Sequence, residues 1–476
     1  MFDVVIIGAG VVGGMIAREL SKYKLSICIL EAKNDVAMGA SKANSAIVHA
    51  GFDAKEGSLK AKLNVRGSLL MKDICSDLGV KYKNNGSMVI GFSKEDDLTL
   101  KDLLERGIKN GVKDLSLLSG DEAREIEPSL SKNVTSALLA KTGAIVCPYE
   151  LTVAAIGNAM DNGAELKCNF KVADIKESEK GYTVISDSGE NIECRFVVNS
   201  AGCYSDEISR LINEETYSVH PRKGEYMLLD KECGDIVKHT IFRTPSKMGK
   251  GILVSPTVDG NLILGPTSVD IDDKEEKGTT RQGFDKIINE ARENIPSIPF
   301  NKVITSFTGL RSVGNTGDFI IKLSRERFVD LGGIESPGLS ASPAIAEEVV
   351  RLLSDAGIVL VEKSNYIGTR APMHEFREAS IEKKNEIIAK DASYGKIICR
   401  CEGVTEGEIL NAIRTNPKPS DLDGIKRRTR AQMGRCQGGF CSPYIIELLA
   451  KELHISEEAV TKSGKGSEII LGRTKV

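Results

Sequence analysis

The sequence has no long apolar run, no tryptophan and no large excess of charge of either sign. Apolar residues never reach the roughly 18 in succession that a membrane helix needs, so we expect no integral membrane segment. The formal net charge is −3, which gives no electrostatic reason to expect binding to nucleic acid or to an anionic membrane. What remains is an ordinary globular composition, 41% hydrophobic and 28% charged, in a 476-residue chain long enough for about three domains.

The N-terminus also lacks the basic region and the small-residue cleavage site of a secretory signal. We therefore expect a cytoplasmic protein. An odd number of cysteines, 11, argues against a disulfide framework in such a chain. Seven are scattered and are expected to be small buried hydrophobic residues, namely Cys28, Cys75, Cys147, Cys168, Cys194, Cys203 and Cys233.

A glycine-rich turn stands in the context that a dinucleotide-binding site requires. The apolar run at 3–7 predicts a strand buried in a parallel sheet, and a helix and a second apolar strand at 25–30 follow the turn. Gly8 permits the tight turn, Gly10 lets the backbone approach a pyrophosphate, and Gly13 lets the helix pack closely on the sheet. The N-terminus of the helix then faces the phosphates.

Glu31 ends the second strand and suits the hydroxyls of an adenosine ribose, whereas an acid there disfavours the 2′-phosphate of NADP. FAD and NAD share this fingerprint. The position of the turn at the start of the chain, and a segment at 328–343 that looks like a return to the same domain, both favour FAD. A glycine turn without a ligand is the structural alternative.

The rest of the chain contains further predicted strands and helices. Short alternating runs within 80–92 and 218–268 predict an antiparallel or mixed sheet. Residues 362–398 are polar and charged, and are interpreted as a linker or a wrapping segment. A separate small unit with helical periodicity begins at 399. Helices are expected at 58–78, 95–112, 279–294 and 344–356.

Several stretches of residues 1–355 together resemble the D-amino-acid oxidase-like flavoproteins, specifically their glycerol-3-phosphate oxidase and dehydrogenase branch. These stretches are IIGAGVVGGMIA (6–17), KANSAIVHAGFD (42–53), RKGEYMLL (222–229), GKGILVSPTVDGNLILGPTS (249–268), FTGLRS (307–312) and GGIESPGLSASPAIA (332–346).

The resemblance implies an α/β (α+β) fold in which a mixed-sheet substrate domain covers the flavin held by a discontinuous Rossmann-like domain. The FAD-binding domain would comprise 1–80, 140–215 and 305–360, and the substrate domain 81–139 and 216–304. A linker at 361–395, a small helical domain at 396–455 and a C-terminal tail at 456–476 would follow.

The resemblance also assigns roles near the flavin ring. His49, at the end of an NSxxxH loop, would be the catalytic base, with Ser45 as a neighbouring contact. Arg311 resembles the substrate-anchoring arginine, Lys250 resembles a lysine that binds substrate or handles protons, and Ser336 matches a pocket position. The plain alternatives are a hydrogen-bonded loop histidine, a salt-bridged arginine and an exposed lysine.

These residue types suit the oxidation of a secondary alcohol. The reaction moves a hydride to flavin N5 and requires a base for the hydroxyl proton, and histidine titrates near neutral pH. A phosphate dianion fits the fork of an arginine bidentately. The positions expected to contact FAD are Gly8, Gly10, Gly13, Glu31, Ser41, Asn44, Ser45, Ala201, Gly202, Gly332, Gly333, Ile334, Gly338, Leu339 and Ser340.

The remaining cysteines form two tight pairs, Cys399 with Cys401 and Cys436 with Cys441. Four thiolates suit zinc or a [2Fe–2S] cluster, and the Cys-x-Cys spacing is less typical of structural zinc. The segment CRCEGVTEGEI…KRRTRAQMGRCQGGFC (399–441) resembles the bacterioferritin-associated-ferredoxin-like [2Fe–2S] domain. The basic residues Lys426, Arg427, Arg428 and Arg430 could offset the charge of the cluster, dock a partner or simply face solvent.

The resemblances together imply an FAD-dependent dehydrogenase for glycerol 3-phosphate. A plain oxidase needs no cluster, so electrons are expected to leave through the cluster to a separate acceptor subunit, NAD-linked or quinone-linked. The late motif GGIESPG departs from the GGK-type motif of the anaerobic dehydrogenase subunit, which keeps L-2-hydroxyglutarate or another 2-hydroxy acid open as substrate. A non-catalytic electron-transfer or redox-sensing subunit and a zinc-stapled binding module are alternatives of other classes.

Overall fold

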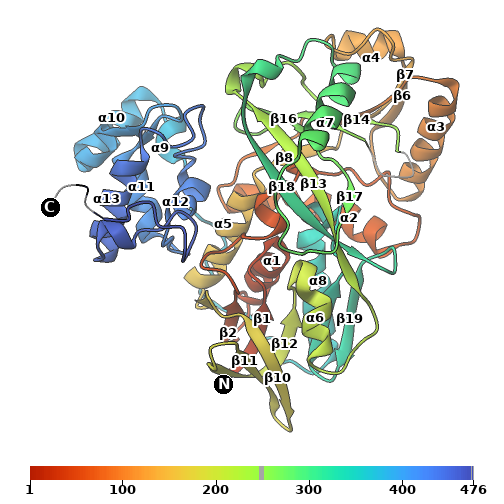
Figure 1. Ribbon diagram of the computed structural model, residues 1–476. Helices are drawn as coiled ribbons and strands as arrows, with labels where there is room; N and C mark the ends of the chain where they lie inside the picture. The colour runs from red at the N-terminus through yellow and green to blue at the C-terminus, as the bar shows by residue number, and fades with distance from the viewer. Residues whose placement is uncertain (246–250, 473, 475–476) are drawn as a thin grey trace.

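The computed structural model describes residues 1–245, 251–472 and 474. Two mixed sheets lie one above the other, and a small unit formed by the C-terminal residues lies to one side of them (Figure 1). The α/β architecture with a helical C-terminal unit is therefore confirmed.

The first sheet contains the glycine-rich turn. Its order is β10-β11-β12-β1-β2-β9, with β20 beside β12 and β19 beside β20. The central strands are parallel and almost fully buried, because apolar side chains pack against both faces of the sheet. The strands are β1 (Phe2–Ile7), β2 (Ile27–Leu30), β9 (Glu165–Lys167), β10 (Val172–Ser178), β11 (Gly181–Ser186), β12 (Asn191–Asn199), β19 (Ile320–Arg325) and β20 (Phe328–Gly332).

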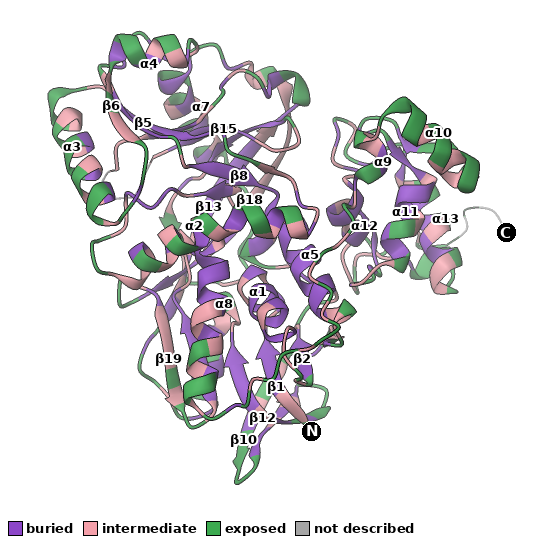
Figure 2. Cartoon of the chain, turned by 180° about the vertical axis from the view of Figure 1, so that it is seen from behind, coloured by how far each residue is buried: buried purple, intermediate pink, exposed green. Residues whose placement is uncertain are grey.

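Helices α1 (Val11–Leu20), α5 (Pro148–Asp161) and α8 (Gly338–Asp355) pack together against this sheet, with α2 (Leu59–Asp77) outside α8. Figure 2 shows the buried faces of α1, α5 and α8 turned inward. Helix α8 starts at Gly338, six residues before the predicted start at 344. A short helix, α6 (Ser205–Arg210), follows β12.

The second sheet has the order β17-β13-β16-β15-β14-β5-β7-β6, with β18 along the other side of β13. Its core is a separate cluster of aliphatic side chains beneath α4 (Gly120–Ile126) and α7 (Arg281–Asn294), and α3 (Lys94–Lys109) lies beside β6 and β7. The strands are β5 (Ser87–Gly91), β6 (Leu115–Ser119), β7 (Ser136–Ala140), β13 (Val219–Leu229), β14 (Thr240–Arg243), β15 (Leu253–Pro256), β16 (Leu262–Gly265), β17 (Val269–Asp270) and β18 (Val303–Gly314).

A short antiparallel sheet lies between the two layers. Strand β8 (Ala144–Val146) pairs with β3 (Ile47–Val48) on one side and β4 (Tyr82–Lys83) on the other. Because β3 leads directly into His49 and β8 leads directly into α5, this small sheet connects the loop predicted to be catalytic with a helix of the first layer.

The C-terminal unit, residues 375–472, has its own core around Val404, Ile409, Ile425, Ile445 and Leu449. Two helices lie in the expected linker, and the ring of Phe376 in the first of them contacts Tyr394 with ring centroids 5.2 Å apart. Val460, in the expected tail, is also buried. Its elements are α9 (Glu375–Glu378), α10 (Ile381–Lys390), β21 (Ile397–Cys399), β22 (Val404–Thr405), α11 (Glu406–Arg414), α12 (Leu422–Thr429) and α13 (Ser442–Leu453).

Within the described part of the chain, no helix has both the length and the apolar character needed to cross a lipid bilayer.

Candidate active site and cysteine centre

A cavity of about 1250 Å³ runs from the carboxyl ends of β1 and β2 to the inner face of β13 and β18. One end is lined by the glycine-rich turn and Glu31, and the other by His49, Arg311 and Ser336. Its length and its position at the carboxyl ends of parallel strands suit a dinucleotide.

The glycines of the turn are sterically required. Gly8 has φ of +104°, and a Cβ on Gly13 would lie 2.1 Å from the carbonyl oxygen of Gly8. Gly8 and Gly10 line the cavity, whereas Gly13 lies behind the wall, at the contact between helix and strand. The distribution matches the three roles predicted from the sequence.

Glu31 and Ser41 complete this end. The Glu31 carboxylate accepts hydrogen bonds from the backbone N–H groups of Ala9 and Lys33, each at 2.9 Å, which fixes its direction beside the cavity. Burial raises the pKa of Glu31, against the effect of these two bonds. The Ser41 hydroxyl accepts a bond of 2.8 Å from the N–H of Val11 at the start of α1. A pyrophosphate there would meet N–H groups and a helix dipole of the favourable sign.

The other positions predicted to contact FAD divide into two groups. Wall-lining residues are Asn44, Ser45, Ala201, Gly202, Ile334, Gly338 and Leu339. Gly332, Gly333 and Ser340 lie behind the wall instead. Gly332 packs against the Tyr217 ring, and Gly333 packs against Gly314. Part of the loop therefore lines the cavity, and which of these residues contact FAD stays a prediction.

His49 is held at its backbone and at its ring. Its N–H donates to the Ser340 hydroxyl at 2.7 Å, and that hydroxyl also bonds to the carbonyl oxygen of Ile47. Its Nε2 lies 3.4 Å from the Ser336 hydroxyl. Ser340 therefore fixes the loop from behind, while Ser336 and His49 meet at the cavity.

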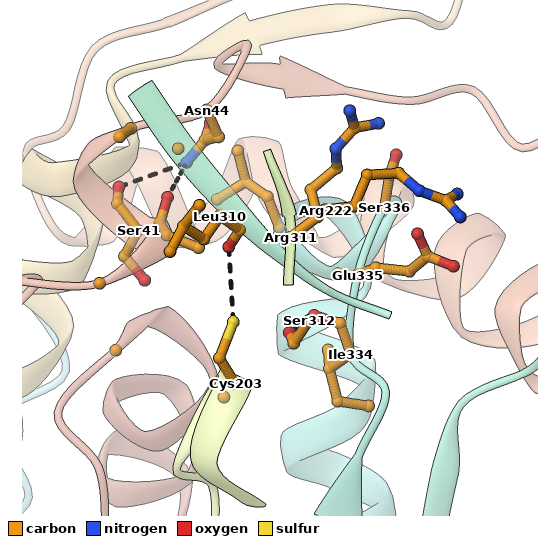
Figure 3. Close-up of a pocket in the computed structure, with 18 of the residues that line it drawn as sticks. Ser41, Asn44, Cys203, Arg222, Leu310, Arg311, Ser312, Ile334, Glu335 and Ser336 are labelled. Carbon is orange, nitrogen blue, oxygen red and sulfur yellow. Dashed lines mark hydrogen bonds between the residues drawn. The ribbon is translucent and has the colours of Figure 1, made fainter. Parts of the chain in front are cut away.

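Arg311 stands on β18 and lines this end of the cavity. Its Nη2 donates to the carbonyl oxygen of Thr267 at 2.9 Å. Its Nε is buried and has no hydrogen-bond partner among the described residues, although buried donors are rarely left unsatisfied. Figure 3 shows Arg311 on the same side of the pocket as Ser336. The arrangement suits an anion. Lys250 lies outside the described residues.

Two residues of β13 also line this end, although the sequence analysis did not select them. Arg222 lies directly across from Arg311 in the β13–β18 register and forms a bidentate ion pair with Asp270. Tyr226 places its hydroxyl 3.2 Å from that of Ser45 and stacks on Phe307. Alternation along a strand puts 222 and 226 on one face, so the period of two could have identified both.

The four paired cysteines gather at the edge of the C-terminal unit. The sulfur atoms of Cys401 and Cys436 lie 3.5 Å apart, and the Cys399 and Cys441 thiols share a hydrogen bond. That bond lowers the pKa of Cys399 to about 6. No group of three or more potential ligands surrounds a single ion position in the part of the chain that the structure describes.

Two pairs of thiols suit a centre with two metal ions, because each iron of a [2Fe–2S] cluster takes two cysteine ligands. The loop around Cys436 adds backbone N–H groups from Gly438, Gly439 and Phe440, which lower the pKa of the Cys436 thiol against its burial. The donor set and its surroundings therefore fit the cluster, and structural zinc with four ligands at one ion fits less well.

Comparison with known proteins agrees with this geometry. A family model described as FAD dependent oxidoreductase matches residues 3–352. The chain belongs to this family. A second model, BFD-like [2Fe-2S] binding domain, matches residues 397–451. FAD and a [2Fe–2S] cluster are accordingly the cofactors of this oxidoreductase.

Individual relatives include a glycerol 3-phosphate dehydrogenase of Caloramator mitchellensis, 46% identical over all of this chain and 99% of the relative. An L-2-hydroxyglutarate dehydrogenase of Bos taurus is 32% identical over 56% of this chain and 61% of the relative. Among solved structures, the dithionite-reduced L-alpha-glycerophosphate oxidase of Mycoplasma pneumoniae with FAD bound superposes with a TM-score of 0.74. The two sequences are 30% identical, and the superposition covers 78% of this chain and 98% of the oxidase chain.

Proposed function

We propose that this flavoprotein oxidises sn-glycerol 3-phosphate to dihydroxyacetone phosphate, and that its electrons leave through the [2Fe–2S] cluster to a separate acceptor protein, NAD-linked or quinone-linked. The observation that carries the proposal is that Arg311, a fixed cation, lines the same end of the cavity as His49. An anion bound there would bring a neighbouring hydroxyl within reach of the histidine.

The chain's own residues divide the work. Arg311 binds the phosphate through its charged guanidinium, whose direction is fixed by the hydrogen bond from Nη2 to the carbonyl oxygen of Thr267. His49 takes the proton of the secondary hydroxyl, with Ser336 and Ser340 holding its ring and its backbone. FAD, when bound, supplies the acceptor for the hydride that leaves the same carbon. Removal of one proton and one hydride converts the alcohol into the ketone.

The length of the curated match supports this substrate, because the C. mitchellensis dehydrogenase aligns with both the cavity half and the cysteine half of the chain. The cluster supports a protein acceptor, since a carrier of single electrons is not needed to pass electrons to oxygen within the same cavity. An arginine also binds carboxylates, so L-2-hydroxyglutarate is the competing substrate.

The test is an anaerobic absorption spectrum recorded before and after addition of glycerol 3-phosphate, and in parallel of L-2-hydroxyglutarate. We expect the phosphate to bleach the flavin band and the 2-hydroxy acid to leave it unchanged. Arg311→Gln should raise the concentration needed for bleaching by about a hundredfold, as expected for loss of a charged hydrogen-bonded contact. Arg281→Gln, which removes an exposed ion pair on α7, is the matched control. Bleaching by L-2-hydroxyglutarate alone would contradict the proposed substrate.

A further inference from the structure

The basic run in α12 does not face solvent and is not free to dock a partner. Arg427 and Arg428 are 5% and 4% exposed and bind Asp35, in the loop that follows Glu31. Arg430 is likewise turned away from solvent toward the second sheet. The run that the sequence left open is therefore the contact by which the C-terminal unit docks on its own flavin-binding half.

Arg430 holds both sides of this contact. It ends α12 with φ of +68°, which turns its side chain away from the helix axis. Its Nη1 donates to Asp259 at 2.6 Å and to the Tyr149 hydroxyl at 3.2 Å, and its Nη2 donates to Asn261 at 3.1 Å. Its Nε donates at 3.0 Å to Glu402, the residue that follows Cys401. One guanidinium thus connects the cysteine loop to α5 and to the turn between β15 and β16.

A short buried line leads from this point to the cavity. The Tyr149 hydroxyl contacts the sulfur of Met433 at 3.4 Å, three residues before Cys436. Two residues earlier in the chain lies Cys147, which is 4% exposed and close enough to Tyr149 to add to the effect of burial in raising the pKa of the Tyr149 hydroxyl. Cys147 follows β8 directly, and β8 pairs with β3 through a bond of 2.9 Å from Val146 N–H to the carbonyl oxygen of Ala46. The next residue of β3, Ile47, lines the cavity.

We propose that the line from β3 through β8, Cys147 and Tyr149 to Met433 is the bridge between the two cofactors, and that Arg430 is the positioning residue that keeps it closed. The inference rests on the proposed function, in which electrons pass from flavin to cluster. In each transfer the reduced flavin loses one electron and the oxidised cluster gains it. The cluster would hold one electron at a time, so it would pass the first to the acceptor protein before it takes the second; the flavin would then be fully oxidised, with its protons released to solvent.

The network permits Arg430 to be replaced without leaving either of its carboxylate partners unpaired. Asp259 keeps a second cation, Lys81 at 3.1 Å, and Glu402 keeps Lys231 at 2.8 Å. The two other arginines still hold the C-terminal unit at Asp35. Arg430→Gln should therefore fold, and its effect should be confined to the bridge. Tyr149→Phe is the second variant, since it keeps the ring and removes only the hydroxyl contacts.

The first readout needs neither activity nor a loaded cluster. Amide hydrogen exchange is measured in the full chain at the start of α5 and at 430–436. Arg430→Gln should lower protection in both segments by about a hundredfold, because a buried charged contact is lost. Arg414→Gln removes an exposed ion pair with Glu452 in the same unit and should leave both segments unchanged. Unchanged protection in Arg430→Gln would overturn its positioning role.

The second readout follows the cluster. The flavin is reduced by light and a sacrificial donor, so the result does not depend on the substrate, and cluster absorbance is recorded with time. We expect flavin reduction at the wild-type rate, cluster reduction at least about tenfold slower in both variants, since each loses hydrogen bonds of the bridge, and normal cluster reduction by dithionite. Cluster reduction at the wild-type rate in both variants would refute the bridge. Failure of glycerol 3-phosphate to bleach the wild-type flavin would instead refute the proposed function alone.

Discussion

Replacement of Asp35 by Asn should loosen the C-terminal unit from the flavin-binding half. Asp35 is 2% exposed and binds Arg428 through both carboxylate oxygens, each at 2.8 Å, with Arg427 on the same oxygen as one of them. The variant keeps the shape of the side chain and leaves two buried guanidinium groups without their counter-ion.

The free energy lost in Asp35→Asn can be estimated from the burial of Asp35, Arg427 and Arg428. Burial alone would raise the pKa of Asp35, but the charges of Arg428 and Arg427 outweigh it and lower the pKa to about 2. A fall of nearly two units below an ordinary aspartate corresponds to about 2.5 kcal/mol. Removing one partner of a buried ionic group typically costs about 3–5 kcal/mol. Arg428 also donates to the carbonyl oxygens of Pro417 and Gly424, which places the expected loss near the lower value, about 3 kcal/mol.

The sign of the pH dependence is fixed by the lowered pKa. Because the folded protein binds the Asp35 proton less tightly than the unfolded chain, the stabilisation is fully present above about pH 4 and is lost as the pH falls toward 2. The Asn variant should lack this acid dependence.

Unfolding of the C-terminal unit is followed by cluster absorbance and by limited proteolysis between 360 and 375 at pH 7. Asp423→Asn is the matched control. Asp423 lies on α12, the helix that carries Arg427 and Arg428, and its ion pair with Lys462 is partly exposed, so it should contribute less than about 1 kcal/mol. If Asp35→Asn and Asp423→Asn unfold at the same denaturant concentration, the docking contact does not have the strength assigned to it.

Three further variants test the two cofactor sites. His49→Ala should slow substrate-driven flavin reduction by about a hundredfold or more while FAD stays bound, as read from the flavin spectrum, because a general base contributes about that much. Gly13→Val should yield protein without flavin absorbance, since even its Cβ would lie 2.1 Å from the carbonyl oxygen of Gly8. Cys436→Ser should lose the cluster absorbance and keep the flavin, and an unchanged cluster spectrum would remove Cys436 from the ligand set.

The features that local sequence could predict are those whose physics is local. A buried strand that leads into a glycine turn, with an acidic residue about 20 positions later, leaves few conformations open. Gly8, Gly10 and Glu31 line the cavity, as this pattern predicts. The two cysteine pairs could also be predicted to bind a metal centre from local sequence, because closely spaced cysteines in a chain without a disulfide framework are typical of metal ligands.

Long-range contacts could not be read in this way. Whether Gly333 faces a ligand or Gly314 depends on how β18 and β20 approach, which no local pattern encodes. Helix α10, within the predicted linker at 361–395, was not expected from the sequence, because it is amphipathic over only a few turns and has no buried residue. The docking role of Arg427 and Arg428 requires Asp35, almost 400 residues earlier in the chain, and single-sequence reasoning has no access to that pairing.

The most direct test of the account is a stoichiometric anaerobic titration of the oxidised protein with glycerol 3-phosphate, followed at flavin and cluster wavelengths. The substrate provides two electrons, the flavin takes two and the cluster takes one, so full reduction of both should require about 1.5 equivalents per chain. An end point near one equivalent, with the cluster still oxidised, would contradict the electron path. The absence of any bleaching would contradict the substrate itself.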